Sequence, residues 1–94
     1  MRLSTESQWW VYMIETQSGK LYTGISTDIE RRFLEHSDPA NTKGAKFFRL
    51  ERALSVVYRE ACANRSAASK RESAIKKMTK KSKWQLAGMT GKPV

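Results

Sequence analysis

Residues 10–24 read WVYMIETQSGKLYTG, which is two short apolar runs joined by a polar segment. The first run holds Trp10-Val11-Tyr12 and the second holds Tyr22-Thr23-Gly24. Aromatic and β-branched residues in runs of this length predict strands. The segment Gln17-Ser18-Gly19-Lys20 between them predicts a hairpin turn. The stretch therefore predicts an antiparallel hairpin with one tyrosine on each strand.

The first strand, predicted over residues 9–15, is apolar on both of its faces. Successive side chains of a strand point to opposite sides, so the apolar residues form two sets: Trp9, Val11 and Met13, and then Trp10, Tyr12 and Ile14. Such a strand is expected at the centre of a sheet that is covered on both faces. In the second strand, residues 21–25, Gly24 predicts a bulge or a close backbone approach.

A helix is predicted after the hairpin, from a capping box at Thr27-Asp28-Ile29-Glu30 to about His36. Ile29, Arg32, Phe33 and His36 then share one helical face. Polar residues are unusual in a core-facing stripe, so Arg32 and His36 are candidates for a site.

The rest of the chain completes the predicted layers. Residues 45–52 predict a short helix, and residues 53–59 predict a third strand. Asn64 or Ser66 is expected to cap a second long helix over about residues 67–78. This order predicts an α+β fold in which helices flank a small three-stranded antiparallel sheet.

Length and composition favour one folded domain. The 94 residues, 39% of them apolar, leave room for a single modest core. We expect the domain over residues 8–86, with a short segment docked through Trp84 and Leu86. Residues 1–7 and 87–94 are expected to be flexible termini.

The charge of the chain points to a polyanionic partner. Lys and Arg number 18 against nine acidic residues, a net charge of +9. This favours nucleic acid first and an anionic membrane second, with solubility as the alternative explanation. One cysteine, Cys62, and one histidine exclude an internal disulfide and a zinc site of the usual composition. No signal peptide or membrane span is visible, so we expect a cytoplasmic protein, with a monomer favoured.

These residues resemble the GIY-YIG nuclease superfamily, and in layout the small single-domain bacterial YhbQ-like (UPF0213) group. Trp10-Val11-Tyr12 stands at the first motif and Tyr22-Thr23-Gly24 at the second. Arg32, His36 and a later glutamate, Glu72, follow in the family's order. Two positions depart from the pattern, since Trp10 replaces a glycine and Thr23 an isoleucine. Neither position is thought to do chemistry in the family.

The resemblance implies a phosphodiesterase site with a single divalent metal, Mg²⁺ or Mn²⁺. Glu72 would be the oxygen ligand of the metal, and Arg32 would hold the phosphoryl oxygens. Tyr12 would act on the water nucleophile, Tyr22 would complete the site, and His36 would assist with protons or hold a phosphate. The residues alone leave open whether Tyr12 or His36 is the general base.

Each residue also has a structural interpretation. The tyrosines could be core residues with satisfied hydroxyls, Arg32 a surface charge, and His36 a structural histidine. Glu72 could be a solvated helix residue paired with Lys76.

Basic side chains supply candidate nucleic-acid contacts: Lys43, Lys46, Arg49, Lys76, Lys77 and Lys80. We expect a metal-dependent endonuclease acting on DNA, with non-duplex or branched structures as candidates and a role in repair or processing. RNA is a further candidate partner. The alternatives are a binding module that keeps the fold with little or no turnover, and a basic protein that docks on RNA-rich assemblies.

Overall fold

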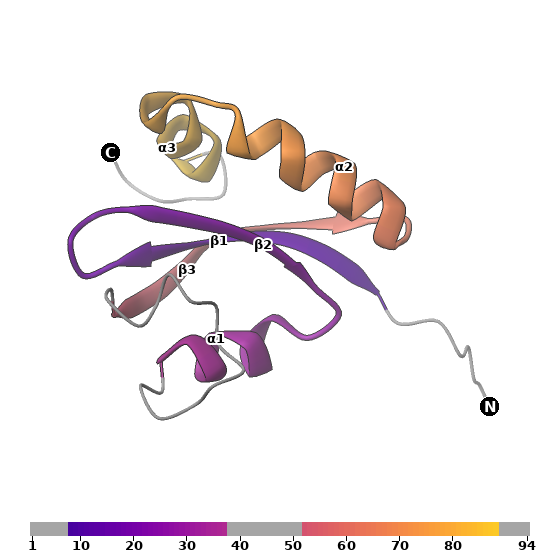
Figure 1. Cartoon of the computed structure of the whole chain (residues 1–94), viewed down its shortest axis with the longest axis horizontal. Helices are drawn as coiled ribbons and strands as arrows, with labels where there is room; N and C mark the ends of the chain where they lie inside the picture. The colour runs from indigo at the N-terminus through magenta and orange to yellow at the C-terminus, as the bar shows by residue number, and fades with distance from the viewer. Residues whose placement is uncertain (1–7, 38–51, 89–94) are drawn as a thin grey trace.

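One three-stranded sheet lies between two helical layers. The computed structural model describes residues 8–37 and 52–88. In chain order the elements are β1 (Trp9–Thr16), β2 (Leu21–Ser26), α1 (Ile29–Ser37), β3 (Ala53–Cys62), α2 (Arg65–Lys76) and α3 (Lys80–Gly88). The strands pair in antiparallel fashion in the order β2-β1-β3. Figure 1 shows α1 on one side of the sheet and α2 and α3 on the other. The predicted α+β architecture is confirmed.

The β1–β2 hairpin closes through a short loop whose geometry requires glycine. The amide of Thr16 donates to the carbonyl of Lys20, and the amide of Gly19 donates to the carbonyl of Thr16, each at 2.9 Å. Gly19 has φ +86°, in the left-handed region that glycine enters without steric cost. The turn fixes the register, so Tyr12 pairs with Gly24 and Ile14 with Tyr22.

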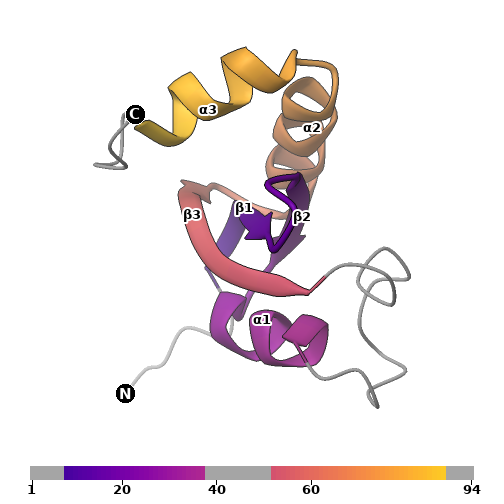
Figure 2. The same ribbon diagram turned by 90° about the vertical axis from the view of Figure 1, so that its left-hand side faces the viewer.

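β1 is buried on both faces, as its alternation predicts. Val11 and Met13 are fully buried in one core, where Val57, Ile75 and Ala87 join them. Tyr12 and Ile14 belong to the other core, which contains Ile29 and Ala53 together with half-buried Trp10, Tyr22, Phe33 and Val56. The turned view in Figure 2 shows the central strand between these helical layers. The candidate tyrosines thus lie in the α1 core.

β3 extends three residues beyond its predicted end at Arg59. The extra residues pair with the start of β1, where Trp9 lies opposite Cys62. The β1–β3 register shifts between Met13 and Ile14 and again between Glu15 and Thr16. At the first shift the register passes from Tyr58 to Val56, and Val57 and Tyr58 both pack in the α2 and α3 core.

The predicted capping box of α1 does not form. The helix begins at Ile29, and Asp28 is its cap because the Asp28 carboxylate accepts a hydrogen bond of 3.0 Å from the amide of Arg31. Ser26 holds this cap, since its hydroxyl accepts from the amide of Asp28. Glu30 instead forms an ion pair of 3.0 Å with Arg59 on β3.

The C-terminal helices differ in part from the prediction. Asn64 caps α2, accepting a 2.8 Å hydrogen bond from the amide of Ala67. The docked segment at Trp84 is a full helix, α3, capped by Thr79 through the amide of Ser82. It continues two residues past the predicted domain end, and its Ala87 is fully buried. The short helix predicted over residues 45–52 lies almost entirely outside the described residues.

Of the helices that the structure describes, none combines the length and the apolar character needed to cross a membrane.

Thr23 is an exception to the pairing of buried polar atoms. Its side chain is 3% exposed, and its hydroxyl has no hydrogen-bond partner. It lies on β2 opposite Met13. A buried hydroxyl without a partner costs stability because it has lost water and gained no replacement. Thr16, in contrast, is fully buried and accepts a 3.1 Å hydrogen bond from the amide of Lys20.

We therefore predict that Thr23→Val raises the free energy of unfolding by about 1 kcal/mol. The matched variant Thr16→Val should lower it by about 1 kcal/mol, because it removes the acceptor of a hydrogen bond at the turn. Urea denaturation of both variants checks this. A loss of stability in Thr23→Val as large as that in Thr16→Val would contradict the assignment of an unsatisfied hydroxyl.

Candidate active site

The candidate site begins with a close approach between Tyr12 and the backbone of Gly24. A Cβ atom built on Gly24 would lie 2.7 Å from the Tyr12 hydroxyl oxygen and 2.8 Å from the ring carbon that carries it. It would also lie 3.1 Å from a ring carbon of Tyr22. These distances are too short for a side chain, so only glycine lets both tyrosine rings lie over β2.

Tyr12, Tyr22 and His36 form one contact cluster. The Tyr12 hydroxyl and Nε2 of His36 are 3.3 Å apart. The Tyr22 ring contacts the His36 ring edge-on, with centroids 5.2 Å apart, and the Tyr12 ring at 6.4 Å. Tyr12 is 1% exposed and His36 is 3% exposed. A strand, a neighbouring strand and a helix thus bring these rings together in the α1 core.

The surroundings of Tyr12 keep its hydroxyl protonated. Burial and the negative charge that Tyr22 can carry raise the pKa of Tyr12 to about 12, although the nearby Arg32 guanidinium lowers it. The charge of Glu72 raises this pKa further. At neutral pH Tyr12 is therefore a hydrogen-bond donor.

The pKa of His36 is shifted in the opposite direction to that of Tyr12. Burial, assisted by the positive charge of Arg32, lowers the pKa of His36 to about 4. The imidazole is therefore neutral at pH 7. With its own proton on Nδ1, it accepts the hydrogen bond that Tyr12 donates to Nε2.

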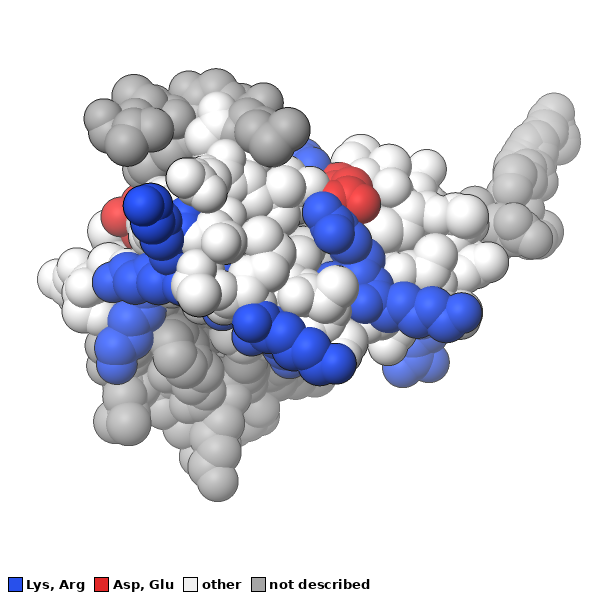
Figure 3. Space-filling view, turned by 90° about the horizontal axis from the view of Figure 1, so that it is seen from above, with Lys and Arg blue, Asp and Glu red and all other residues white. Residues whose placement is uncertain are grey.

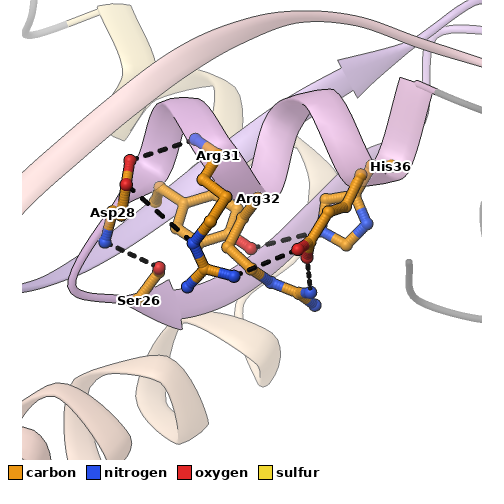
Figure 4. Close-up of polar contacts among 7 residues, drawn as sticks. Ser26, Asp28, Arg31, Arg32 and His36 are labelled. Carbon is orange, nitrogen blue, oxygen red and sulfur yellow. Dashed lines mark hydrogen bonds and ion pairs between the residues drawn. The ribbon is translucent and has the colours of Figure 1, made fainter. Parts of the chain in front are cut away.

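Arg32 is held at the edge of this cluster by Glu35. The Glu35 carboxylate binds both Arg32 and Arg31, the latter at 3.0 Å (Figure 4). Burial lowers the pKa of Arg32, but hydrogen bonding to Glu35 and the interaction with Tyr12 outweigh it, so the pKa lies above its ordinary value. The guanidinium is thus a permanent cation, half-buried and held in position.

Glu72 lies on α2, on the side of the sheet opposite to α1 (Figure 1). Its side chain is 21% exposed and forms an ion pair of 3.3 Å with Lys76, one helical turn later. This is the pairing that the structural interpretation of Glu72 expects. Glu72 nevertheless acts on Tyr12, because its charge contributes to the raised pKa of that hydroxyl. Its carboxylate is therefore within electrostatic reach of the site.

The described residues offer one candidate carboxylate for a divalent metal. Within residues 8–37 and 52–88, no group of three or more His, Cys, Asp or Glu side chains could hold a metal ion. Mg²⁺ commonly retains several waters and takes only one or two carboxylates together with substrate phosphates. Glu72 is half-buried and its charge acts on Tyr12, so it is the candidate for that single carboxylate.

The predicted nucleic-acid contacts are only partly described. Lys76 ends α2, Lys77 caps it and Lys80 begins α3. Figure 3 shows basic side chains spread across the face that carries these helices, with few acidic ones among them. Lys43, Lys46 and Arg49 lie outside the described residues.

Two further residues, Gly24 and Glu35, help to position the side chains of the site. Gly24 in the second motif predicted a close backbone approach, but only the strand register shows that Tyr12 makes it. Glu35 gave a weaker signal, its spacing of three residues from Arg32 and four from Arg31.

The fold and this arrangement define the class of protein. The family model for the GIY-YIG catalytic domain matches residues 8–85. The chain therefore belongs to the GIY-YIG family, a nuclease superfamily.

Relatives place it in a particular group, named UPF0213. A UPF0213 protein of Desulfotalea psychrophila is 51% identical over 76% of this chain, which spans 63% of that relative's length. The UPF0213 protein YhbQ of Escherichia coli is 41% identical over 83% of this chain and 75% of its own. The solution NMR structure of a UPF0213 protein from Bacillus halodurans has a TM-score of 0.55 and 32% identity, covering 92% of this chain and 88% of that one.

The depressed pKa of His36 predicts acid sensitivity of folding. Because His36 binds a proton more weakly when folded than when unfolded, its contribution is complete above pH 6.5 and is lost as pH falls toward about 4. By pH 4.5 the loss should reach roughly 2 kcal/mol. Urea denaturation between pH 7 and pH 4.5, with NMR titration of the imidazole, measures it.

His36→Gln is the control, since it keeps a polar side chain that does not titrate in this range. It should remove most of the slope. The lowered pKa values of Glu30 and Glu35 place their effects at more acidic pH. A wild-type imidazole that titrates near 6.5 would contradict the buried, neutral assignment.

Proposed function

We propose that this protein is a divalent-metal-dependent endonuclease that hydrolyses phosphodiester bonds in DNA. The observation that carries the proposal is the Tyr12 hydroxyl, which contacts His36 at 3.3 Å and is influenced by the charges of both Arg32 and Glu72. Such a set offers a phosphate-binding cation, a proton donor, a proton acceptor and a candidate metal ligand whose charge acts on the same hydroxyl.

Arg32 has the task of binding the phosphate. Its permanent positive charge can grip non-bridging phosphoryl oxygens and stabilise the negative charge that grows on them in the transition state. Glu35 limits the freedom of the guanidinium before substrate arrives. A preorganised cation avoids reorganisation during the reaction, which is where such groups gain their effect.

Tyr12 and His36 divide the work on the proton. Tyr12, protonated at neutral pH, orients the attacking water and passes its own proton to neutral His36 as it accepts one from that water. The water oxygen forms a bond to phosphorus, the bond to the leaving oxygen breaks, and that oxygen takes up a proton from a solvent water molecule. Tyr12 is therefore a relay and His36 the final proton acceptor.

Glu72 would hold the metal, with waters and substrate oxygens as its other ligands. When bound, the ion supplies Lewis-acid stabilisation of the phosphate and the leaving oxygen. Glu72 must exchange its ion pair with Lys76 for this contact.

The net charge of the chain bears on its partner. A net charge of +9 on 94 residues supports binding to nucleic acid, and we propose the cytoplasm as its location. We propose DNA repair or processing, with branched or single-stranded DNA as preferred substrates and RNA as a competing ligand.

A second candidate function is nucleic-acid binding with little or no turnover. The Glu72 carboxylate forms an ion pair with Lys76, and the Arg32 guanidinium forms one with Glu35. Tyr12 and His36 are also almost completely buried. If these contacts persist with nucleic acid bound, the fold would bind its ligand without cutting it.

A cleavage panel separates the two. Purified protein is incubated with labelled duplex, flap, branched and single-stranded DNA in Mg²⁺ or Mn²⁺. We expect wild type to cut at least one substrate, and Arg32→Ala and Glu72→Gln each to lose about 10²–10³-fold in rate.

The chain offers matched controls for both variants. Arg31→Ala removes a neighbouring arginine that binds the same Glu35, and Glu30→Gln removes an exposed glutamate of α1. Both should keep wild-type rates. Cleavage that Arg32→Ala and Glu72→Gln leave intact would refute the assigned site. Binding without cutting in any metal would favour the second function.

A further inference from the structure

A hollow lined mainly by lysines lies between the β1–β2 turn and α3. This solvent-open hollow of about 260 Å³ is lined by Lys20, Leu21, Lys80 and Lys83. Figure 1 shows the turn and α3 at the same end of the molecule. Lys80 and Lys83 are three residues apart at the start of α3 and so share one helical face. The turn and the helix, distant in sequence, therefore direct three lysines to one hollow.

Within the part of the chain that the structure describes, the lysines of the hollow form no ion pair. The ion pairs of this part involve Arg31, Arg32, Arg59, Arg71 and Lys76, and none involves a lysine of the hollow. Ammonium groups around one hollow repel each other, so an anion there gains the attraction of all three. The N-terminus of α3 adds its positive dipole end.

The hollow is also built on well-fixed backbone. At Lys20 the amide donates to the Thr16 hydroxyl at 3.1 Å, and the carbonyl accepts from the amide of Thr16 at 2.9 Å. The start of α3 is fixed by Thr79, whose hydroxyl accepts from the amide of Ser82 at 3.1 Å. Fixed anchor points reduce the ordering that ligand binding requires.

We propose that this hollow, formed by Lys20, Lys80 and Lys83, is a second phosphate-binding site that holds a nucleic-acid strand beyond the bond to be cut. The strand order makes β2 an edge strand. Leu21 lines the hollow on the α2 and α3 side, whereas Tyr22 packs in the α1 core. Lys20 is only two residues from Tyr22, about 7 Å along a strand. We therefore expect a nucleic-acid strand that is bound at Arg32 to reach the hollow by passing around the β2 edge of the sheet.

The inference rests on the proposed function for its ligand, but it does not need cleavage to be true. It adds Lys20 and Lys83 to the nucleic-acid contacts. Cleavage of a substrate too short to reach the hollow should not change when these two lysines are replaced. For a longer substrate, the loss of these lysines should raise KM and leave kcat unchanged, because the hollow lies on the α2 and α3 side of the sheet and Tyr12 on the α1 side.

Binding of single-stranded DNA in EDTA tests the site without cutting. Lys20→Gln/Lys83→Gln should reduce the slope of log K against log salt by about 1.4, the value for two lost phosphate contacts. Lys70→Gln/Lys81→Gln removes the same charge from exposed helix positions that do not line the hollow, and should leave the slope nearly unchanged. Equal effects of the two doubles would overturn the proposal, since generic attraction would then explain both.

NMR titration locates the ligand. Oligonucleotides with and without a 5′-terminal phosphate, and inorganic phosphate, should shift the amide signals of residues 19–21 and 79–83, and Lys20→Gln/Lys83→Gln should abolish these shifts. Shifts from both oligonucleotides identify an internal phosphate as the ligand, and shifts from the phosphorylated one alone identify a terminal phosphate. No shift at these residues would refute the site. Intact binding here in a protein that cuts nothing would refute the endonuclease alone.

Discussion

The close approach of Tyr12 to the backbone of Gly24 is the constraint on which the site depends. A Cβ at residue 24 would meet the Tyr12 hydroxyl at 2.7 Å, so the absence of a side chain decides where that hydroxyl lies. The hairpin turn sets the register that puts Tyr12 opposite Gly24. From this position the hydroxyl contacts His36, and Arg32 and Glu72 act on it. One local steric condition thus places a hydroxyl that contacts His36 and whose pKa responds to charges on α1 and α2.

The two faces of the sheet bury different kinds of side chain. On the α2 and α3 face, Val11, Met13 and Ile75 are fully buried and supply apolar packing. On the α1 face, Tyr12 and His36 are buried just as deeply but carry polar atoms. Burial on that face shifts their pKa values in opposite directions, to about 12 and about 4. Desolvation makes the Tyr12 hydroxyl and the His36 imidazole costly to bury. It also keeps Tyr12 protonated and His36 neutral at pH 7, so one is a proton donor and the other a proton acceptor.

Much of the fold could be predicted from local pattern, and less of the site. Alternation over residues 9–15 was sufficient to predict a central strand covered on both faces, because burial on both sides leaves no polar face. The cap of α1 was placed one residue early, since Asp28 and Thr27 are both good caps and only the hydrogen bond from the Arg31 amide separates them. The bulge at Val57 and the ion pair of Glu35 depend on tertiary packing that no single segment encodes. The hollow at Lys20 joins a turn to a distant helix, so no sequence spacing reveals it.

Gly24→Ala is the most direct test of this account. It should lower the free energy of unfolding by roughly 1–3 kcal/mol and displace the Tyr12 ring, because the new methyl group overlaps the Tyr12 hydroxyl. Gly88→Ala, where an added Cβ meets nothing within 4 Å, should stay within about 0.5 kcal/mol of wild type. Urea denaturation gives the stabilities, and NMR gives the ring position through contacts between Tyr12 and His36. The account predicts that only Gly24→Ala loses stability and these contacts together. A Gly24→Ala protein that matches Gly88→Ala in both would contradict it.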